Sequence, residues 1–514
     1  MTGRMHHDVW DVCVVGTGMG GGTVGYALAR AGFRVVFVEM GQNLEGPESL
    51  VGKCSEDFLD SKHDFSQTFL RAGRYAKKIF LQTSWGRKPY FTPVIGSGVG
   101  GSSSLYGAVL ERFSEEEMPE NLWPDPARRL DPWYAQAESL FKVNASRLEQ
   151  DLPLVEREVF QSLRDQNYTP YVLPLAVADV QTCYGCQGHL CPKNCKNHAG
   201  NVCVEPAVKN DQAQLRAGWT VVKLLTDGSR VVGAFCRREN GETEIIKARL
   251  FILAAGALET PALLLRSVSK SSPNGLANRS GLVGKNLMRH LVTLYLMRSK
   301  TGSVLCKGVG LNFETGTIRA NLQSFGRMPP LRMALFEISE MFEQFLLKLL
   351  SPFYTVVRFF LEKFYQFRAE DCFVLALVGQ DRPSLENRVQ IGGSGTSPRA
   401  GVPPQDLVLY YKVSPDDQRA FLGHEKIVDG LLKKFRPMKV RQIHENRRIA
   451  HVCGTCKMGE NPQTSVVDPW NKCHDVDNLY IVDASYFPTS GCHGPSLTIA
   501  ANALRVAKKI ISDH

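Results

Sequence analysis

The segment DVCVVGTGMGGGTVGYALARAGFRVVFVE, residues 11–39, decides the fold. It begins with an apolar run that predicts a buried strand, and a turn of glycines follows. Helical spacing up to Gly32 then predicts an amphipathic helix, and a second apolar run predicts another strand. The segment therefore predicts a complete βαβ unit, which requires two parallel strands.

The glycines of this segment follow the pattern expected where a strand turns into a helix beside a dinucleotide. Gly16 and Gly18 permit a tight turn and a close approach of backbone to a pyrophosphate, and Gly21 lets the helix pack on the strand. The helix N-terminus favours the phosphate charge. Glu39 ends the second strand, where a carboxylate can accept both ribose hydroxyls and would repel a 2′-phosphate. The segment predicts a dinucleotide site that disfavours NADP and leaves NAD and FAD open.

The composition is that of a globular protein. The chain has 514 residues, 43% hydrophobic and 22% charged, which suffices for two domains and argues against disorder. The net charge of +10 mildly favours an anionic partner such as a nucleotide, an acidic protein or a membrane surface. Lysines and arginines are scattered, without a basic run or a zinc finger, so we expect no nucleic-acid partner.

The N-terminal sequence bears on localisation. The residues MTGRMHHDVW lead almost directly into the first strand, which leaves no room for a signal peptide with its apolar region and cleavage site. The sequence contains no run of about eighteen uncharged apolar residues, so it predicts no membrane-spanning helix. We therefore expect a cytoplasmic protein without Sec-type export, with peripheral membrane contact left open.

A second glycine cluster, GSGVGGSSSLYGAVLERF, occupies residues 96–113. Its members Gly100, Gly101, Ser102 and Ser103 offer bare backbone amides and small hydroxyls to an anion or to the edge of a ring. The alternative is a flexible surface loop.

Residues 248–267, ARLFILAAGALETPALLLRS, predict a buried strand, a small-residue turn and a helix. Thr260 is the expected N-cap of that helix, with Pro261 at its first position. A plain core element would show the same pattern.

The C-terminal part of the chain carries the most informative block. It contains HVCGTCKMG at 451–459 and LYIVDAS at 479–485, which predicts a strand. After Pro495, apolar residues recur at helical spacing almost to the end of the chain. The N-terminus of this last helix is expected to face the end of that strand.

Together these segments resemble the glucose-methanol-choline (GMC) oxidoreductases, in that family's order. The matching segments are the glycine fingerprint at 16–21, GSGVGGSSS at 96–104, AAGALETPALLLRS at 254–267, HxxGT at 451–455 and the terminal block. GLVGKNLMRH at 281–290 is a further similar element, and only about 300–440 shows no recognisable motif.

The resemblance implies an α/β fold with a Rossmann-like FAD-binding domain assembled from separated segments and an α+β substrate-binding domain. The expected FAD-binding domain comprises residues 1–130, 196–299 and 446–514. A cysteine-rich insertion at 131–195 and a substrate-binding domain at 300–445 complete the chain.

The implied cofactor is FAD. Its expected contacts are Gly16, Gly18, Gly21, Glu39, Gly100, Gly101, Ser102, Ser103, the backbone of Val222, Ala255, Gly256, Asp483, Ala484, Pro495 and Ser496. The dipole of the last helix would stabilise a reduced flavin anion, and Asp483 would hold the ribityl or phosphate side. The chain departs from the family pattern at Ser97, where a basic residue or Asn is usual, and at Tyr106, where Asn or His is usual.

Two histidines are the candidate catalytic residues. Oxidation of an alcohol removes a proton from oxygen and a hydride from carbon, and an imidazole suits the proton transfer near neutral pH. His451 occupies the HxxGT position and is the expected base. His493, in GCHGPSLT, lies where the family carries a second His or an Asn that bonds the substrate oxygen. The usual Asn-Pro pair is here His-Gly-Pro, one residue longer.

A cysteine-rich segment, CYGCQGHLCPKNCKNHAGNVC, spans residues 183–203. Such a density of thiols is not a packing signal, and it predicts a metal site formed by Cys183, Cys186, Cys191 and Cys195. The spacing resembles the cluster loop of the iron-sulfur dehydrogenases within the same family. That likeness implies a [3Fe-4S] or [4Fe-4S] cluster, with zinc or a purely structural loop as alternatives.

The apolar segment at 331–367 carries aromatic and aliphatic residues at helical spacing, with a break at Ser351-Pro352. It predicts two amphipathic helices. They would cover the substrate domain's sheet, or form a peripheral membrane face, a partner interface or an entrance for a hydrophobic alcohol.

The leading hypothesis is an FAD-dependent alcohol dehydrogenase that passes electrons through an iron-sulfur cluster to a carrier protein or quinone. One alternative is an FAD oxidase that uses oxygen. Another, from a different class, is a non-catalytic flavin-fold binding protein, which would not need His451.

Overall fold

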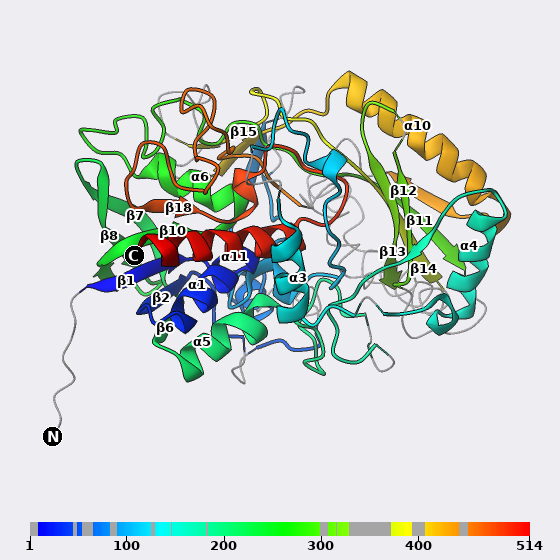
Figure 1. Ribbon diagram of the computed structural model, residues 1–514, viewed down its shortest axis with the longest axis horizontal. Coiled ribbons are helices and arrows are strands. Elements are labelled where there is room, and N and C mark those ends of the chain that lie inside the picture. The colour runs from blue at the N-terminus through cyan, green and yellow to red at the C-terminus, as the bar shows by residue number, and fades with distance from the viewer. Residues whose placement is uncertain are drawn as a thin grey trace, which may run out of the picture.

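The computed structural model describes residues 9–44, 49–53, 65–82, 90–124, 129–144, 146–180, 183, 185–298, 307–314, 316–327, 372–392, 407–441 and 451–514. Figure 1 shows two bodies side by side. One surrounds a parallel sheet and contains both ends of the described chain, and the other surrounds an antiparallel sheet.

The parallel sheet has five strands, and all of their pairings are parallel. Their order is β18 (Leu479–Ile481), β10 (Ala248–Leu253), β1 (Trp10–Val15), β2 (Val35–Glu39) and β6 (Ala213–Ala217). Helix α1 (Met19–Arg30) connects β1 to β2, and Gly32 follows it with a φ of 95°. The βαβ unit is confirmed, and glycine ends its helix because other residues rarely adopt that backbone conformation.

Segments from both ends of the chain complete this body. Helix α11 (Ser496–Asp513) packs against α1, as Figure 1 shows, and β18 adds the edge strand beside β10. Helix α6 (Gly256–Arg266) follows β10, and α5 (Glu205–Asn210) precedes β6. A separate three-stranded sheet is formed by β7 (Thr220–Asp227), β8 (Arg230–Arg237) and β9 (Thr243–Ile246).

The second body contains a six-stranded sheet. Its order is β17 (Met438–Arg441), β11 (Leu291–Arg298), β14 (Cys372–Gly379), β13 (Ala320–Arg327), β12 (Val309–Phe313) and β5 (Tyr171–Val172). Helices α4 (Leu154–Arg164) and α10 (Pro415–Leu431) share a buried apolar core with this sheet, and Figure 1 shows them at its far side. Strand β11 belongs to this sheet although its residues lie in the segment 196–299 that was expected in the FAD-binding domain. Strand β5 and α4 come from the expected cysteine-rich insertion.

A four-stranded sheet joins early and late parts of the chain. It is formed by β15 (Arg388–Ile391), β16 (Leu407–Tyr410), β3 (Ile79–Gln82) and β4 (Tyr90–Phe91). The remaining elements are α2 (Phe65–Arg71), α3 (Asp131–Leu140), β-bridges, and short helical turns that include Gly101–Ser104, Glu115–Glu117, Gly200–Val204 and Ala484–Tyr486.

The apolar segment at 331–367 lies outside the described residues, so its expected helices stay a prediction. Within the part of the chain that the structure describes, no helix combines the length and apolar character needed to span a bilayer.

Candidate active site

Two fingerprint glycines after β1, Gly16 and Gly21, have no room for a side chain. Gly16 has a φ of 96°, and a Cβ on it would lie 2.4 Å from the carbonyl oxygen of Ala254. A Cβ on Gly21 would lie 2.1 Å from the carbonyl oxygen of Gly16. The turn therefore packs directly against the end of β10, as the tight turn of a dinucleotide fingerprint requires.

The two glycine-rich segments touch each other. A Cβ on Gly101 would lie 3.0 Å from Cα of Gly18, which is the N-cap of α1 and has no capping side chain. The first amides of a helix lack partners within the helix. Bare backbone from both segments thus borders the N-terminus of α1, and this arrangement suits a pyrophosphate.

Glu39 joins these segments through its buried carboxylate. One oxygen accepts hydrogen bonds from the amide and hydroxyl of Thr17, at 3.1 and 2.7 Å. The other accepts from the amides of Gly41 and Gly98, at 2.9 and 3.1 Å. Glu39 therefore holds the fingerprint turn, the end of β2 and the second glycine segment together.

The hydroxyls of the second glycine segment have different partners. Ser102 Oγ accepts from the amide of Gly96 at 2.9 Å, and Ser103 Oγ donates to the carbonyl of Gly100 at 2.6 Å. Ser97, one of the departures from the family pattern, is 3% exposed, and its Oγ has no hydrogen-bond partner among the described residues. A buried hydroxyl without a partner is costly, so this donor fits a bound cofactor. Tyr106, the other departure, donates its hydroxyl to the carbonyl of Asn197.

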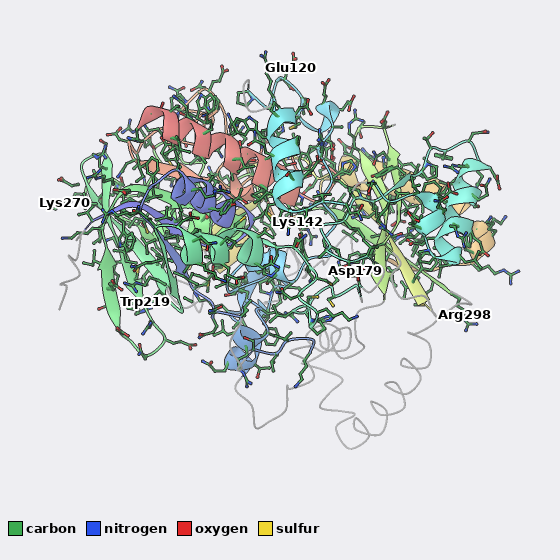
Figure 2. All side chains as sticks on the ribbon, turned by 60° about the horizontal axis from the view of Figure 1, so that its bottom comes forward. Glu120, Lys142, Asp179, Trp219, Lys270 and Arg298 are labelled. Carbon is green, nitrogen blue, oxygen red and sulfur yellow. The ribbon has the colours of Figure 1, made fainter. Side chains whose placement is uncertain are left out.

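Val222 lies at an irregular position in β7. Val221 pairs with Cys236 and Lys223 pairs with Phe235, so Val222 falls at a bulge between them. The strand starts beside Glu39, because Trp219 donates its amide to the carbonyl of Glu39 at 3.0 Å. Figure 2 labels Trp219 on this body, away from Arg298 at the end of β11. A bulge frees backbone groups for another partner.

Asp483 anchors the start of α6. Its Oδ2 accepts from the amide of Gly256 at 2.9 Å and from the hydroxyl of Thr260 at 2.5 Å. Its Oδ1 accepts from the amide of Ser485 at 2.9 Å. Burial raises the pKa of Asp483, an effect that the hydrogen bonds oppose. Its expected role beside the flavin stays a prediction, whereas its contacts within the protein are fully formed.

The predicted start of α6 was wrong. Thr260 and Pro261 lie inside the helix, which begins at Gly256, because Asp483 supplies the cap from a distant part of the chain. Pro261 has no amide hydrogen to donate to Ala257 four residues earlier. The hydroxyl of Thr455 donates to that carbonyl instead, at 2.7 Å. The proline therefore creates the docking point for the HxxGT segment.

Four further predicted contacts lie at element ends near this point. Ala255 is the N-cap of α6. The carbonyl of Ala484 accepts a hydrogen bond from the amide of Gly454 at 3.1 Å. Pro495 is the N-cap of α11, which begins at Ser496, and no side chain caps this helix.

His451 faces a histidine that the sequence did not single out. Met288 and Cys453 form an antiparallel bridge, with both backbone hydrogen bonds at 3.0 Å. In an antiparallel pair, residues two positions away on each side also lie opposite each other, which here are His290 and His451. Their Nδ1 atoms are 2.8 Å apart, and their rings meet edge to face with centroids 4.8 Å apart.

The hydrogen bonds define the protonation of this pair. His290 is 1% exposed, and its Nε2 lies 3.1 Å from the carbonyl oxygen of Ser490, which can only accept. Burial lowers the pKa of His290 to about 4, so the ring is neutral and its Nδ1 is an acceptor. His451 must then donate from Nδ1, which leaves its Nε2 as an unprotonated base.

The surroundings of His451 support that form. Desolvation, followed by the neighbouring His290, lowers the pKa of His451 to about 3. The residue is nonetheless exposed, whereas Cys453 and Thr455 are buried, and its φ is 58°. A neutral imidazole with an accessible surface in a rarely adopted backbone conformation is typical of a functional position.

His493 has different partners from His451. Its Nδ1 lies 2.7 Å from Glu117 Oε2, and the other oxygen of Glu117 accepts the amides of Cys492 and His493 at 2.6 and 3.2 Å. Burial opposes the charged ring, but Glu117, Cys492 and Glu111 together raise the pKa of His493 well above its ordinary value. For Glu117, His493 outweighs burial and the pKa falls to about 2. The two form a buried ion pair.

The second nitrogen of His493 faces the antiparallel sheet. Its Nε2 lies 3.0 Å from Asn312 Oδ1 and 3.9 Å from Glu111 Oε1, and Glu111 accepts the hydroxyl of Tyr171 at 2.6 Å. Asn312 is exposed between buried neighbours on β12. The structure gives His451 and His493 no direct contact, but His290 lies within the electrostatic influence of His493.

The four predicted cysteines line one small cavity. Cys183, Cys186, Cys191 and Cys195 are all free thiols, and Cys191 Sγ lies 3.5 Å from Cys195 Sγ. The cysteine set is therefore brought together from one loop, with thiols that share no disulfide. The donor chemistry fits a thiolate-bound metal centre. Cys191 and Cys195 would have to separate around a multi-iron cluster.

Two buried lysines line the same cavity. Lys196 Nζ donates to the carbonyl of Ser104 at 3.1 Å, and Lys307 Nζ donates to the carbonyl of Gly107 at 2.8 Å. Burial lowers the pKa of both lysines to about 8, and neighbouring cysteine sulfurs act in the opposite direction. The lysines connect the cysteine loop to the second glycine segment.

Comparison with known proteins agrees with this geometry. The GMC oxidoreductase N-terminal family model matches residues 13–292, and the C-terminal one matches 423–503. Paromamine 6'-oxidase of Streptomyces fradiae is 28% identical over 98% of this chain and 92% of its own length. 2-methyl-1,2-propanediol dehydrogenase of Mycolicibacterium austroafricanum is 24% identical over 98% of this chain and 95% of its own length. The crystal structure of pyridoxine 4-oxidase from Mesorbium loti has a TM-score of 0.67 at 18% identity. The match covers 98% of this chain and 100% of that one.

Proposed function

Because this chain belongs to the GMC oxidoreductase family, we propose that it oxidises a small hydroxylated molecule at an alcohol carbon, with His451 as the base. The single observation that carries the proposal is the hydrogen bond between His451 and His290. It fixes the proton of His451 on Nδ1 and leaves the lone pair of Nε2 for a substrate hydroxyl.

The relatives support an alcohol substrate. The name paromamine 6'-oxidase belongs to a protein that shares 28% of its residues with this chain, and a propanediol dehydrogenase shares 24%. Both names describe oxidation of molecules that carry hydroxyl groups. We therefore infer that polar, hydroxylated molecules are the first substrates to test.

The chain's own residues divide the work of the reaction. Bound FAD would supply the acceptor for the hydride. His451 accepts the hydroxyl proton at Nε2, and His290 holds its ring through Nδ1. The cationic His493, held by Glu117, supplies positive charge that favours negative charge on the substrate oxygen during proton removal. The neutral base and the charged ring thus have separate roles.

The residues that would hold FAD come from three segments. The contacting glycines 18 and 101 and the N-terminus of α1 suit the pyrophosphate, and the Val222 bulge offers backbone groups to the adenine side. The hydroxyl of Ser97 is a buried donor that a cofactor would satisfy. These features support FAD binding.

We also propose a route for the electrons after they reach the flavin. The four cysteines would hold an iron-sulfur centre that takes single electrons and passes them to a carrier protein or quinone. The free thiols around one cavity support this role, and so do the hydrogen bonds that connect Lys196 to Ser104 and Lys307 to Gly107 of the glycine segment. Iron and acid-labile sulfide in anaerobically purified protein test it. If both are absent after reconstitution, the relay is rejected.

The main experiment is anaerobic bleaching of the bound flavin by a panel of polyols, amino alcohols and long-chain alcohols. We expect wild-type protein to bleach with at least one polar alcohol. His451→Ala should retain the flavin spectrum, but its bleaching rate should be lower by a factor of about 100 or more. General base catalysis typically contributes a factor of that size. Equal bleaching rates would refute the base assignment.

The same preparation tests the acceptor. A dehydrogenase consumes substrate with an added electron carrier and forms little peroxide. Hydrogen peroxide formed in equal amount to the oxidised substrate would instead establish an oxidase. Colourless protein after growth with riboflavin and soaking with FAD would contradict both.

A further inference from the structure

The positive charge of two lysines beside the cysteine cavity is balanced only if the cysteine sulfurs carry negative charge. Lys196 is 4% exposed and Lys307 is 3% exposed, and both line the cavity with the four cysteines. Among the described residues, no carboxylate forms an ion pair with either ammonium group. Buried charges persist in proteins when they are paired, because an unpaired buried charge is very costly.

The nearest other charged groups have their own partners. Arg147 donates to the carbonyl of Lys307 at 2.8 Å, and the carboxylates of Glu156 and Asp151 act on that guanidinium. Glu156 also accepts the amide of Gly308 at 2.8 Å. Within the described part of the chain, the groups left to carry negative charge beside the two lysines are the cysteine sulfurs.

The hydrogen bonds of the lysines leave their charge uncompensated. Each ammonium reaches a backbone carbonyl of the second glycine segment, Ser104 for Lys196 and Gly107 for Lys307, and Lys196 also reaches the carbonyl of His189 at 3.4 Å. A carbonyl accepts a hydrogen bond but carries no net charge. Two positive charges therefore remain beside the thiols.

We propose that Lys196 and Lys307 are the counter-ions of a doubly negative thiolate centre formed by the four cysteines. Four thiolates around one zinc ion carry two negative charges. A [4Fe-4S] cluster with four thiolates and a [3Fe-4S] cluster with three carry the same charge in their oxidised forms. The shared chemistry is a thiolate-bound dianion, and the choice among its metals rests on the proposed electron relay.

The pair also has a consequence for a redox-active centre. Adding an electron to a dianion raises its negative charge, and nearby ammonium groups favour that step. Because these lysines are bonded to the glycine segment, they hold the centre against the part of the chain that is expected to contact the flavin. The lysines act as positioning residues.

The test compares four variants with wild-type protein purified anaerobically. Lys307→Gln retains a hydrogen-bond donor without the charge, Lys307→Arg retains the charge, and Lys196→Gln repeats the first change at the second lysine. Lys193→Gln, on the exposed part of the same loop, is the matched control. The readouts are iron, sulfide and zinc content, and the rate at which a chelator removes the metal.

We expect both buried Gln variants to lose the centre about tenfold faster or more, as is typical when a group supporting metal ligands is removed. Lys307→Arg and Lys193→Gln should behave like wild type. If the centre contains iron, its midpoint potential should fall in Lys307→Gln and recover in Lys307→Arg. Wild-type retention rates and an unchanged potential in both Gln variants would overturn the proposal.

Metal analysis separates this proposal from the electron relay. Zinc without acid-labile sulfide would reject the iron-sulfur electron relay. The counter-ion proposal would then be tested by the rates at which the chelator removes zinc from the lysine variants. If wild-type protein contains neither metal, the ultraviolet thiolate absorbance of the folded protein decides. A stronger thiolate signal in wild type than in Lys307→Gln supports the counter-ions, and equal signals reject them.

Discussion

Nδ1 of His290 lies 2.8 Å from Nδ1 of His451, and the opposite nitrogen of His290 lies against the carbonyl of Ser490. The three groups form a directional chain of hydrogen bonds that begins at a backbone atom. A carbonyl cannot donate, so each proton in the chain has one allowed position. His290 therefore determines which nitrogen of His451 is basic.

Replacement of His290 tests that relationship. In His290→Leu, His451 loses the acceptor for its Nδ1 proton, and we expect the bleaching rate to fall about 10- to 100-fold, within the range for a misplaced catalytic base. His290→Gln offers an amide oxygen and should restore part of the rate. Stopped-flow bleaching under anaerobic conditions measures both. Identical rates for the Leu and Gln variants would contradict the tautomer argument.

The pH profile gives a second readout for the same variants. Burial is the main cause of the lowered pKa of His451 and His290 adds to it, so removal of His290 should move the acid limb of kcat/KM to higher pH. In the wild-type protein, with the pKa of His451 at about 3, the base remains unprotonated down to low pH. His474→Gln, a histidine bonded to Ser465 in another part of the fold, is the control and should leave the limb unchanged.

Glu117→Gln tests the buried ion pair with His493. We expect the free energy of unfolding to fall by about 3 kcal/mol, since a buried charge is left without its partner. Urea unfolding at pH 6 measures the change. Glu115→Gln, on the same short helical turn but exposed, is the matched control and should cost about 0.5 kcal/mol or less.

The same pair predicts a pH dependence of stability. The pKa of Glu117 is lowered to about 2, so its contribution is complete above about pH 4.5 and is lost as the pH falls toward 2. The raised pKa of His493 contributes below its unfolded value of about 6.5 and is lost as pH rises through the folded value. Glu117→Gln should remove the acid dependence. An unchanged slope of stability between pH 2 and 4.5 would refute it.

Gly16 and Gly32 make a matched pair for the fingerprint turn. They have φ values of 96° and 95°, but a Cβ on Gly16 meets Ala254, whereas one on Gly32 meets nothing within 4 Å. We expect Gly32→Ala to cost only the backbone strain of about 1–2 kcal/mol. Gly16→Ala should cost more and release the flavin. Absorbance of the purified variants and their thermal unfolding measure both effects, and equal flavin content would contradict the packing argument.

Thr455→Val tests the link between the HxxGT segment and Pro261. The change removes the donor to the carbonyl of Ala257, and the proline cannot replace it, so we expect a loss of about 1–3 kcal/mol. Thr464→Val, at an exposed position, is the control. Because the segment continues to His451, the first variant should also raise KM or lower kcat. Wild-type stability in Thr455→Val would show that the carbonyl has another partner.

Local patterns in the sequence predicted the parts of the fold that local forces determine. The strand, turn and helix at 11–39 follow from apolar spacing and from glycines, of which Gly16 and Gly21 have no room for a side chain. The four cysteines lie on one loop, so their proximity also follows from the local sequence, whereas the metal site stays a prediction. The start of α6 was mispredicted, since its cap, Asp483, is 227 residues away from Gly256.

The partners of the two candidate histidines were beyond sequence reasoning for a similar reason. His290 closes the quoted element GLVGKNLMRH, but only the bridge between Met288 and Cys453 brings it opposite His451. Glu117 follows two other glutamates, and nothing in that run distinguishes the one that turns inward. A tertiary pairing between distant segments leaves no periodic signal in either one.

The placement of β18 and α11 affects how the protein is made. A ribosome produces β1, α1 and β10 long before these last elements, yet β18 is the edge strand beside β10 and α11 covers α1. The nascent chain must therefore leave the exit tunnel with an unfinished sheet and with the apolar side of α1 uncovered, a surface that chaperones bind. Cofactor loading becomes a post-translational event, and a chain without β18 and α11 would lack an edge strand of the parallel sheet and the helix that covers α1.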